Sequence, residues 1–88
     1  METKIFPVNS GTNPGKLAGA IVAGLQSGNV SLSAIGPAST HKLVLAICII
    51  SQWGYKPAIQ LEQSSTDAGT RIICTVRPYD ANHTRVIE

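Results

Sequence analysis

The chain has 88 residues with a formal net charge of +2, and 14% of its residues are charged while 43% are hydrophobic. This length predicts one domain, and the charge is too small to indicate a strongly basic nucleic-acid binder. Cys48 and Cys74 lie far apart in apolar runs, which excludes a disulfide framework and a tightly spaced zinc site and predicts two buried free thiols. The first residues lack the basic start and apolar core of a signal peptide, so we expect a cytoplasmic protein.

The first half of the chain predicts a strand, a helix and a second strand. Residues 4–8 form a short apolar stretch, and Pro7 places it at a sheet edge because proline cannot donate a ladder hydrogen bond. Asn13 and the proline after it then predict a helix start, and the helix extends to about Gln26 with apolar side chains on one face. Residues 30–35 alternate between apolar and polar side chains, which is typical of a half-buried strand.

A second helix is expected from about Ala38 to Trp53, and it contains the most apolar run of the chain. Leu43–Ile50 carries no polar side chain except one thiol, and it is too short to cross a membrane, which takes about 20 apolar residues. A helix on a sheet buries one stripe of its surface, so we expect this one to form much of a homodimer interface. Two alternatives stay open: the chain itself covers the run, or the run is a buried strand. The expected interface residues are Leu43, Leu45, Ile47, Ile49, Ile50 and Trp53.

The last part of the domain predicts a β-hairpin. Residues 58–63 and 71–77 both alternate, and the turn signals at 64–69 join them. In the first of these strands we expect Ile59 and Leu61 to point inward.

The resulting order, βαβαββ, predicts an α/β protein, more closely an α+β two-layer sandwich. Its four-stranded mixed sheet should carry both helices on one face. Because a helix connects the first two strands, these should be parallel with a right-handed crossover. We expect one domain at 1–78 and a polar C-terminal tail at 79–88.

The sequence contains no catalytic or metal-binding motif. His41 and His83 are the only histidines, and the acidic residues are scattered over the chain ends, one sheet face and a turn. We therefore expect no enzyme activity, no cofactor, no metal site and no membrane contact.

The starts of the two helices are the strongest candidate for a binding site. Parallel strands place both starts at one edge of the sheet, where free amides and the helix dipole favour an anion such as phosphate. Cations in these first turns are unfavourable by about 0.3–1 kcal/mol unless an anion is bound, although ordinary solvated lysines also tolerate so small a mismatch. The expected nucleic-acid-binding residues are Lys16, Lys42, His41, Asn13 and Thr12 at the helix starts, with Arg71 and Arg77 as a weaker patch on the open sheet face.

Small-residue motifs between residues 9 and 50 point to a known family. A Ser/Asn-rich loop leads into a helix with the small-residue core Leu17–Ala20, a short strand ends in Ala34-Ile35-Gly36, and a long apolar helix follows. In these features the chain resembles the stage V sporulation protein S family, a small Alba-like group from bacteria. The resemblance covers about residues 4–77.

This resemblance implies an Alba-like fold, a dimer or higher oligomer, no enzyme activity, and nucleic-acid binding linked to the regulation of development. Alba proteins carry lysines in the loop before the first helix and a long basic hairpin. Here only Lys16 falls in that region, and the loop Ser64–Thr70 is short with Asp67 as its one charge. Two hypotheses follow: a regulatory dimer that contacts the DNA or RNA backbone, and a protein-interaction module that uses the apolar second helix. A small anion or nucleotide binder is a third.

Overall fold

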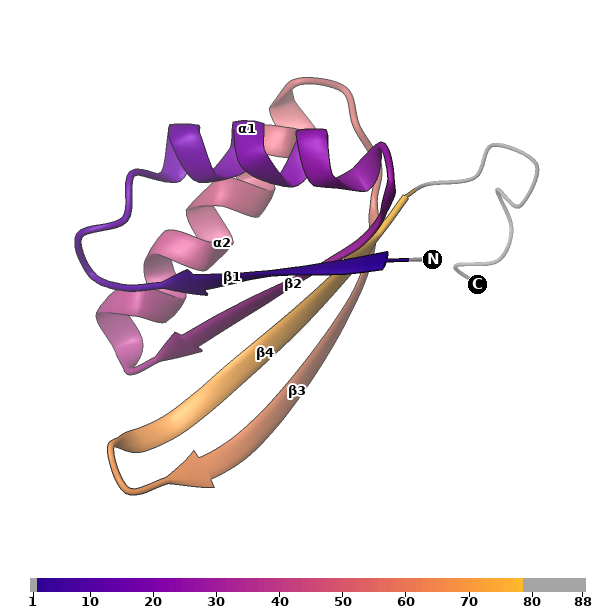
Figure 1. The fold of residues 1–88 in the computed structure, drawn as a ribbon. Coiled ribbons are helices and arrows are strands. Elements are labelled where there is room, and N and C mark those ends of the chain that lie inside the picture. Colours follow the sequence, from indigo (N-terminus) through magenta and orange to yellow (C-terminus); the bar gives the residue numbers. More distant parts are fainter. Residues whose placement is uncertain (1, 79–88) are drawn as a thin grey trace.

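Four strands form one mixed sheet, and two helices cover one of its faces (Figure 1). The computed structural model describes residues 2–78, so the expected tail at 79–88 lies outside the described residues. The elements in chain order are β1 (Glu2–Val8), α1 (Pro14–Leu25), β2 (Gly28–Ile35), α2 (Pro37–Gln52), β3 (Ala58–Thr66) and β4 (Gly69–Arg77).

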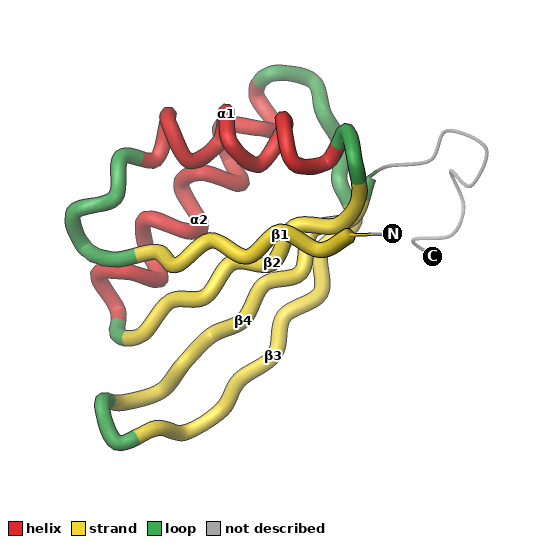
Figure 2. Tube along the Cα trace, in the orientation of Figure 1, coloured by secondary structure: helices red, strands yellow, loops and turns green. Residues whose placement is uncertain are grey.

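The strand order is β1-β2-β4-β3, with β1 parallel to β2 and the remaining pairs antiparallel (Figure 2). Phe6 of β1 lies opposite Leu32 of β2, and Leu32 lies opposite Cys74 of β4. Cys74 in turn lies opposite Leu61 of β3. The order βαβαββ, the parallel first pair and the two-layer arrangement are thereby confirmed.

The core lies between the helices and the inner part of the sheet. Helix α1 buries a stripe that includes Ile21, and Gly24 lets it approach β2, because a Cβ there would lie 2.7 Å from Val30 Cγ2. The apolar core residues are Val8, Leu17, Ala18, Ile21, Val30, Leu32, Ala34, Leu43, Ala46, Ile50, Cys74 and Val76.

Helix α2 buries a narrower part of its surface than its composition suggests. Ser39, Leu43, Ala46 and Ile50 face the core at helical spacing, so the alternative of a buried strand for this run is wrong. Helix α1 packs beside α2, and Ile49 is half-buried against the core. One chain therefore covers much of the apolar run by itself.

Strand β3 is longer than the sequence indicates, and the turn after it is shorter. The ladder continues to Thr66, which lies opposite Gly69. The Thr66 hydroxyl donates to the Gly69 carbonyl at 2.6 Å and accepts from the Ala68 amide at 3.2 Å. Gly69 has a φ of +128°, a value that favours glycine. The polar residues before the turn thus continue the strand instead of forming a loop.

Ile59 and Leu61 of β3 point to the expected face of the sheet, but they are not buried there. Ile59 and Leu61 lie on the helix-side face, because they are opposite the buried Val76 and Cys74, yet they are 42% and 64% exposed. The reason is that the core beneath the helices extends over β1, β2 and β4 but stops before the edge strand β3 (Figure 1).

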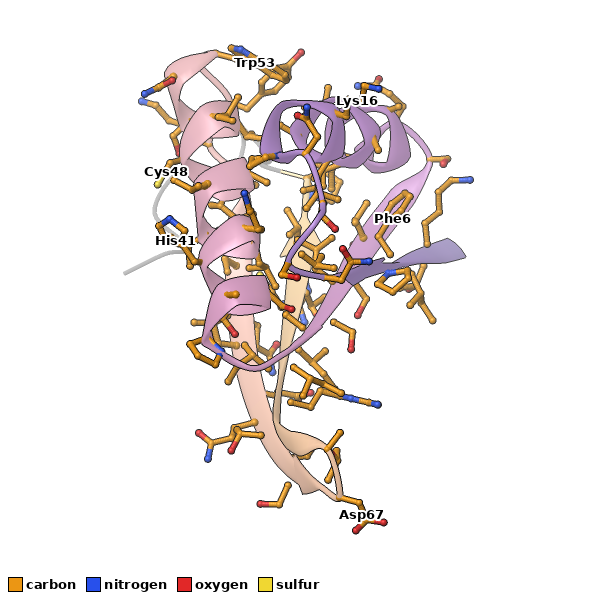
Figure 3. The ribbon with its side chains drawn as sticks, turned by 90° about the vertical axis from the view of Figure 1, so that its left-hand side faces the viewer. Phe6, Lys16, His41, Cys48, Trp53 and Asp67 are labelled. Carbon is orange, nitrogen blue, oxygen red and sulfur yellow. The ribbon has the colours of Figure 1, made fainter. Side chains whose placement is uncertain are left out.

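The two thiols also differ, although the sequence predicts both to be buried. Cys74 lies in the core, and its burial raises the pKa of the thiol to about 11. Cys48 is exposed on the outer side of α2 (Figure 3). It lies within an apolar run, but its helical position turns it away from the buried stripe.

Candidate nucleic-acid interface

The two helix starts lie at the same edge of the sheet, as the parallel pairing requires (Figure 1). Residues 9–13 connect the carboxyl end of β1 to α1, and Gly36 alone connects β2 to α2. Both helices therefore direct their amide ends, and the positive ends of their dipoles, toward this edge. We call this region the helix-start edge.

The start of α1 is closed by its own side chains. The Lys16 amide donates to Asn13 Oδ1 at 3.1 Å, which makes Asn13 the N-cap, with Pro14 in the first turn. The hydroxyl of Thr12 accepts from the Asn9 amide at 2.9 Å. These bonds order the loop and occupy acceptor atoms of both Asn13 and Thr12.

The start of α2 is open by contrast. Its N-cap is Gly36, which has a φ of +88° and no side chain to cap the helix. The Thr40 hydroxyl and the Thr40 amide both donate to the Gly36 carbonyl, at 2.8 and 3.1 Å. The amides of Ala38 and Ser39 in the first turn have no acceptor within the helix. Of the two starts, that of α2 offers more free donors to an anion.

Basic side chains surround this edge. Lys16 is exposed in the first turn of α1. In the second turn of α2, His41 is exposed and Lys42 is half-buried. Neither α1 nor α2 contains an acidic residue, and Asp67 lies at the hairpin tip (Figure 3). The structure thus places Lys16, His41 and Lys42 at one edge, together with the predicted Asn13 and Thr12.

The two arginines lie on the other face of the sheet, at opposite ends of β4. Arg71 is opposite Ile35, the last residue of β2, so it lies at the helix-start edge. Its Nε is buried and has no hydrogen-bond partner among the described residues. Arg77 lies six residues further along β4, about 20 Å away at the usual strand rise. Its guanidinium donates to Gln60 Oε1 at 3.0 Å, so Arg77 does not join the helix-start edge.

A groove separates the start of α2 from the hairpin tip. Its volume is about 720 Å³, and its walls come from Gly36–Val44 on one side and from Ala68–Ile72 on the other. His41 is part of its lining, with Thr40 and Thr70 as the other polar residues, and the rest of the lining is glycine or apolar. Sequence analysis missed this groove, because nothing in the local pattern shows how far the hairpin bends away from α2.

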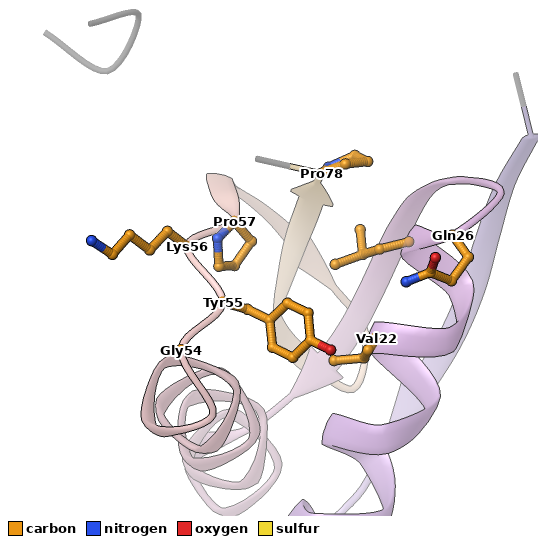
Figure 4. A pocket seen from close by; sticks show the side chains of 8 residues that line it. Val22, Gln26, Gly54, Tyr55, Lys56, Pro57 and Pro78 are labelled. Carbon is orange, nitrogen blue, oxygen red and sulfur yellow. The ribbon is translucent and has the colours of Figure 1, made fainter. Parts of the chain in front are cut away.

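A smaller cavity of about 430 Å³ lies at the far end of the molecule, where the helices end (Figure 4). Val22 of α1 and Gln26, the residue after the helix, form one side, while Tyr55 and Pro57 form the other. Lys56 is the one charged residue of its lining, and the lining holds no catalytic pair.

The expected interface residues of α2 fall into three groups. Leu43 and Ile50 are 2% and 0% exposed in the core of the single chain, which leaves no surface for a partner. Leu45, Ile47 and Ile49 are half-buried. Trp53 is exposed, and so is Val44, a residue that sequence analysis did not include.

Within residues 2–78, no three His, Cys, Asp or Glu side chains gather closely enough to hold a metal ion. In the same part of the chain, no helix combines the length and apolarity needed to cross a membrane.

In a comparison with known protein families, residues 4–64 match the family described as stage V sporulation protein S. No curated protein matches the chain. The matched region contains both helices with their starts, and it ends within β3, before Arg71 and Arg77.

Proposed function

The chain belongs to the stage V sporulation protein S family, and from this premise we propose that it is a non-enzymatic regulatory protein that binds the phosphate backbone of nucleic acid as a dimer. Family membership supports a sporulation-related role. Binding of DNA or RNA in the cytoplasm is the activity that the geometry of the helix-start edge supports best.

The observation that carries this proposal is the open start of α2 beside basic side chains. An uncapped helix start presents free amides and a positive dipole end, and both favour an anion. His41 and Lys42 follow in the second turn of α2, where they can attract a negative partner to the helix start. Lys16 lies at the same edge, so a chain of phosphates can contact both helix starts.

The mode of binding follows from the groups that are present. Amides, lysines and a histidine recognise phosphate oxygens, which position a nucleic acid without reading its bases. We therefore expect weak to moderate affinity, little sequence preference and a strong dependence on salt.

A fluorescence-anisotropy titration of labelled DNA and RNA at two salt concentrations tests the proposal. A protein with about three phosphate contacts should lose roughly twenty-fold in affinity when the salt concentration triples. The double variant Lys16→Glu/Lys42→Glu should lose binding at both concentrations. Lys4→Glu/Lys56→Glu is the matched control, because it changes the net charge equally but leaves the helix-start edge intact.

Two outcomes would contradict the proposal. The absence of any binding at low salt would leave the basic residues as ordinary solvated side chains. Equal losses in both double variants would show that net charge, and not the helix-start edge, governs the contact.

A protein-interaction module remains the second candidate function, and one observation favours it. Val44 on α2 and Leu61 on β3 are 49% and 64% exposed, on the side of the molecule where the helices leave the sheet bare. Contact with another protein would bury this apolar surface. A stable complex without nucleic-acid binding at low salt would favour this alternative.

A further inference from the structure

The two edges of the sheet differ in how they resist further pairing. Strand β1 is one edge, and it carries Pro7, which cannot donate a ladder hydrogen bond, and the exposed Lys4. Strand β3 is the other edge, and its nine residues include no proline and no lysine. Glu62 is the one charged residue of β3. Natural edge strands are usually protected by such residues, so β3 is suited to pair with another strand.

The apolar layer of the sheet continues to this unprotected edge. Ile59 lies beside Val76 and Leu61 lies beside Cys74, and both β4 residues are fully buried. The β3 side chains in the same rows are 42% and 64% exposed. A strand added at β3 would extend both apolar rows by one further residue.

We propose that β3 pairs with β3 of a second copy of this chain, antiparallel about a two-fold axis, with Gln60 opposite the partner's Gln60. An antiparallel pair of identical strands is compatible with two-fold symmetry, because the same residues of each copy form the contact. The unpaired backbone groups along β3 then gain partners, and the two sheets become one of eight strands.

The side chains select this register. Residues directly opposite each other in an antiparallel pair lie on the same face of the sheet. The two-fold axis must therefore pass between two copies of the same residue, because any position between neighbouring residues would pair side chains of opposite faces. Centring on Gln60 places Ile59 opposite the partner's Leu61, twice by symmetry. Centring on Leu61 would place Ile59 opposite the partner's Gln63, and centring on Glu62 would place two like charges together.

Charge complementarity favours the same register on the open face. Ala58 lies opposite Arg77 within one chain. In the proposed pair, the partner's Glu62 lies on the other side of Ala58, so Glu62 and Arg77 occupy one row, two strands apart. Two strand spacings are about 10 Å, and the small Ala58 side chain leaves room for the two long side chains to meet. The exposed Arg77 already donates to Gln60 Oε1 on this face.

This contact deepens the dimer of the proposed function and assigns its surface to β3. Because the pairing is antiparallel, the helix-start edges of the two copies lie at opposite ends of the joined sheet. One dimer can then contact two separate segments of nucleic acid.

Disulfide trapping tests the contact and its register. In a Cys48→Ser background, Gln60→Cys should cross-link under mild oxidation, because opposite residues in an antiparallel pair lie within about 5.5 Å of each other. Leu61→Cys and Glu62→Cys are the matched controls for the neighbouring registers and should cross-link far less. Stronger cross-linking of either control would overturn the register, and the absence of cross-linking in all three variants would overturn the contact.

Exchange of the charges provides the second test, by sedimentation. Glu62→Arg should weaken the dimer about ten-fold, since two ion pairs become two repulsive pairs. The double variant Glu62→Arg/Arg77→Glu should restore it, because the exchanged charges again face each other between chains. Equal association of all three proteins would contradict the proposal. Neither test contains nucleic acid. A negative result would therefore contradict the β3 contact without contradicting phosphate binding at the helix starts.

Discussion

Strands β2 and β3 carry the same alternation of apolar and polar side chains but have very different surroundings. In β2, Val30, Leu32 and Ala34 are at most 1% exposed. In β3, Ile59 and Leu61 point to the same side of the sheet and are 42% and 64% exposed. The strands differ because β2 lies inside the sheet beneath the helices, whereas β3 is an edge that the helices do not reach.

The comparison shows that alternation determines which face a side chain joins, but not whether anything covers that face. Coverage depends on strand order and on the length of the connections. Helix α1 connects the parallel strands β1 and β2 and must lie across them. Helix α2 packs beside α1, and the core beneath the two helices includes residues of β1, β2 and β4 but none of β3.

Truncation of one leucine in each strand should give the largest difference. Leu32→Ala removes a side chain that is fully buried, and it should lower the free energy of unfolding by about 2 to 5 kcal/mol. Leu61→Ala removes a largely exposed side chain, and the monomer should lose about 0.5 kcal/mol or less. Urea denaturation at low protein concentration measures both values.

Protein concentration provides the control for this pair. At high concentration, Leu61→Ala should become more costly if β3 is paired with a second copy, while the cost of Leu32→Ala in the core should change less. A large and concentration-independent effect of Leu61→Ala would contradict the comparison, since it would mean that β3 is covered within one chain.

The two cysteines extend the comparison to reactivity. The raised pKa of Cys74, about 11 against a usual value of 9.0, lowers its thiolate fraction about a hundred-fold at neutral pH, and burial restricts access further. A thiol reagent at pH 8 should therefore label the exposed Cys48 quickly and Cys74 only after unfolding. Mass spectrometry of the labelled peptides distinguishes the two sites, and rapid labelling of both in the native protein would contradict the buried position of Cys74.

The sign of the pH dependence follows from the same pKa. Folding favours the neutral thiol of Cys74, so its contribution to stability is complete below pH 9.0, the pKa of the unfolded state. That contribution falls as the pH rises from 9.0 toward 11. Cys74→Ala should remove this part of the alkaline loss when both proteins are unfolded in urea across that range.

Much of the fold follows from local signals in the sequence. Asn13 with the proline after it marks the start of α1, and the alternation in residues 30–35 marks β2. These signals act over a few residues, so they predict the helix and the strand without knowledge of the tertiary structure. The family resemblance, confirmed over residues 4–64, adds the arrangement of the elements.

The exposed parts of α2 could not be predicted in the same way. Its apolar run has hydrophobic side chains around the whole helix, so periodicity gives no signal for the buried stripe of Leu43, Ala46 and Ile50. The sequence therefore predicts a buried Cys48, whereas the structure exposes it. Only the positions of α1 and the sheet decide which side of α2 is covered.

The candidate site was partly visible in the sequence. The basic residues at both helix starts could be identified, but the difference between a closed and an open start was missed. A signal existed, because Gly36 has no side chain that could cap α2, while Asn13 has one. The groove beside His41 had no such signal, since residues far apart in sequence form its two sides.

Gly24 provides the close contact that lets α1 cover β2. Gly24→Ala would place a Cβ 2.7 Å from Cγ2 of Val30, a stiff and fully buried side chain that cannot move away. The strain should cost about 1 to 3 kcal/mol, which exceeds the roughly 1 kcal/mol that alanine gains over glycine within a helix.

Gly19→Ala is the matched control in the same helix, because a Cβ there meets nothing within 4 Å. It should stabilise the protein by up to about 1 kcal/mol, so the two substitutions should shift the urea midpoint in opposite directions. If both were stabilising, α1 would have room to move away from β2. The full coverage of β2 would then not depend on the missing side chain at Gly24, and the contrast with β3 would rest on strand order alone.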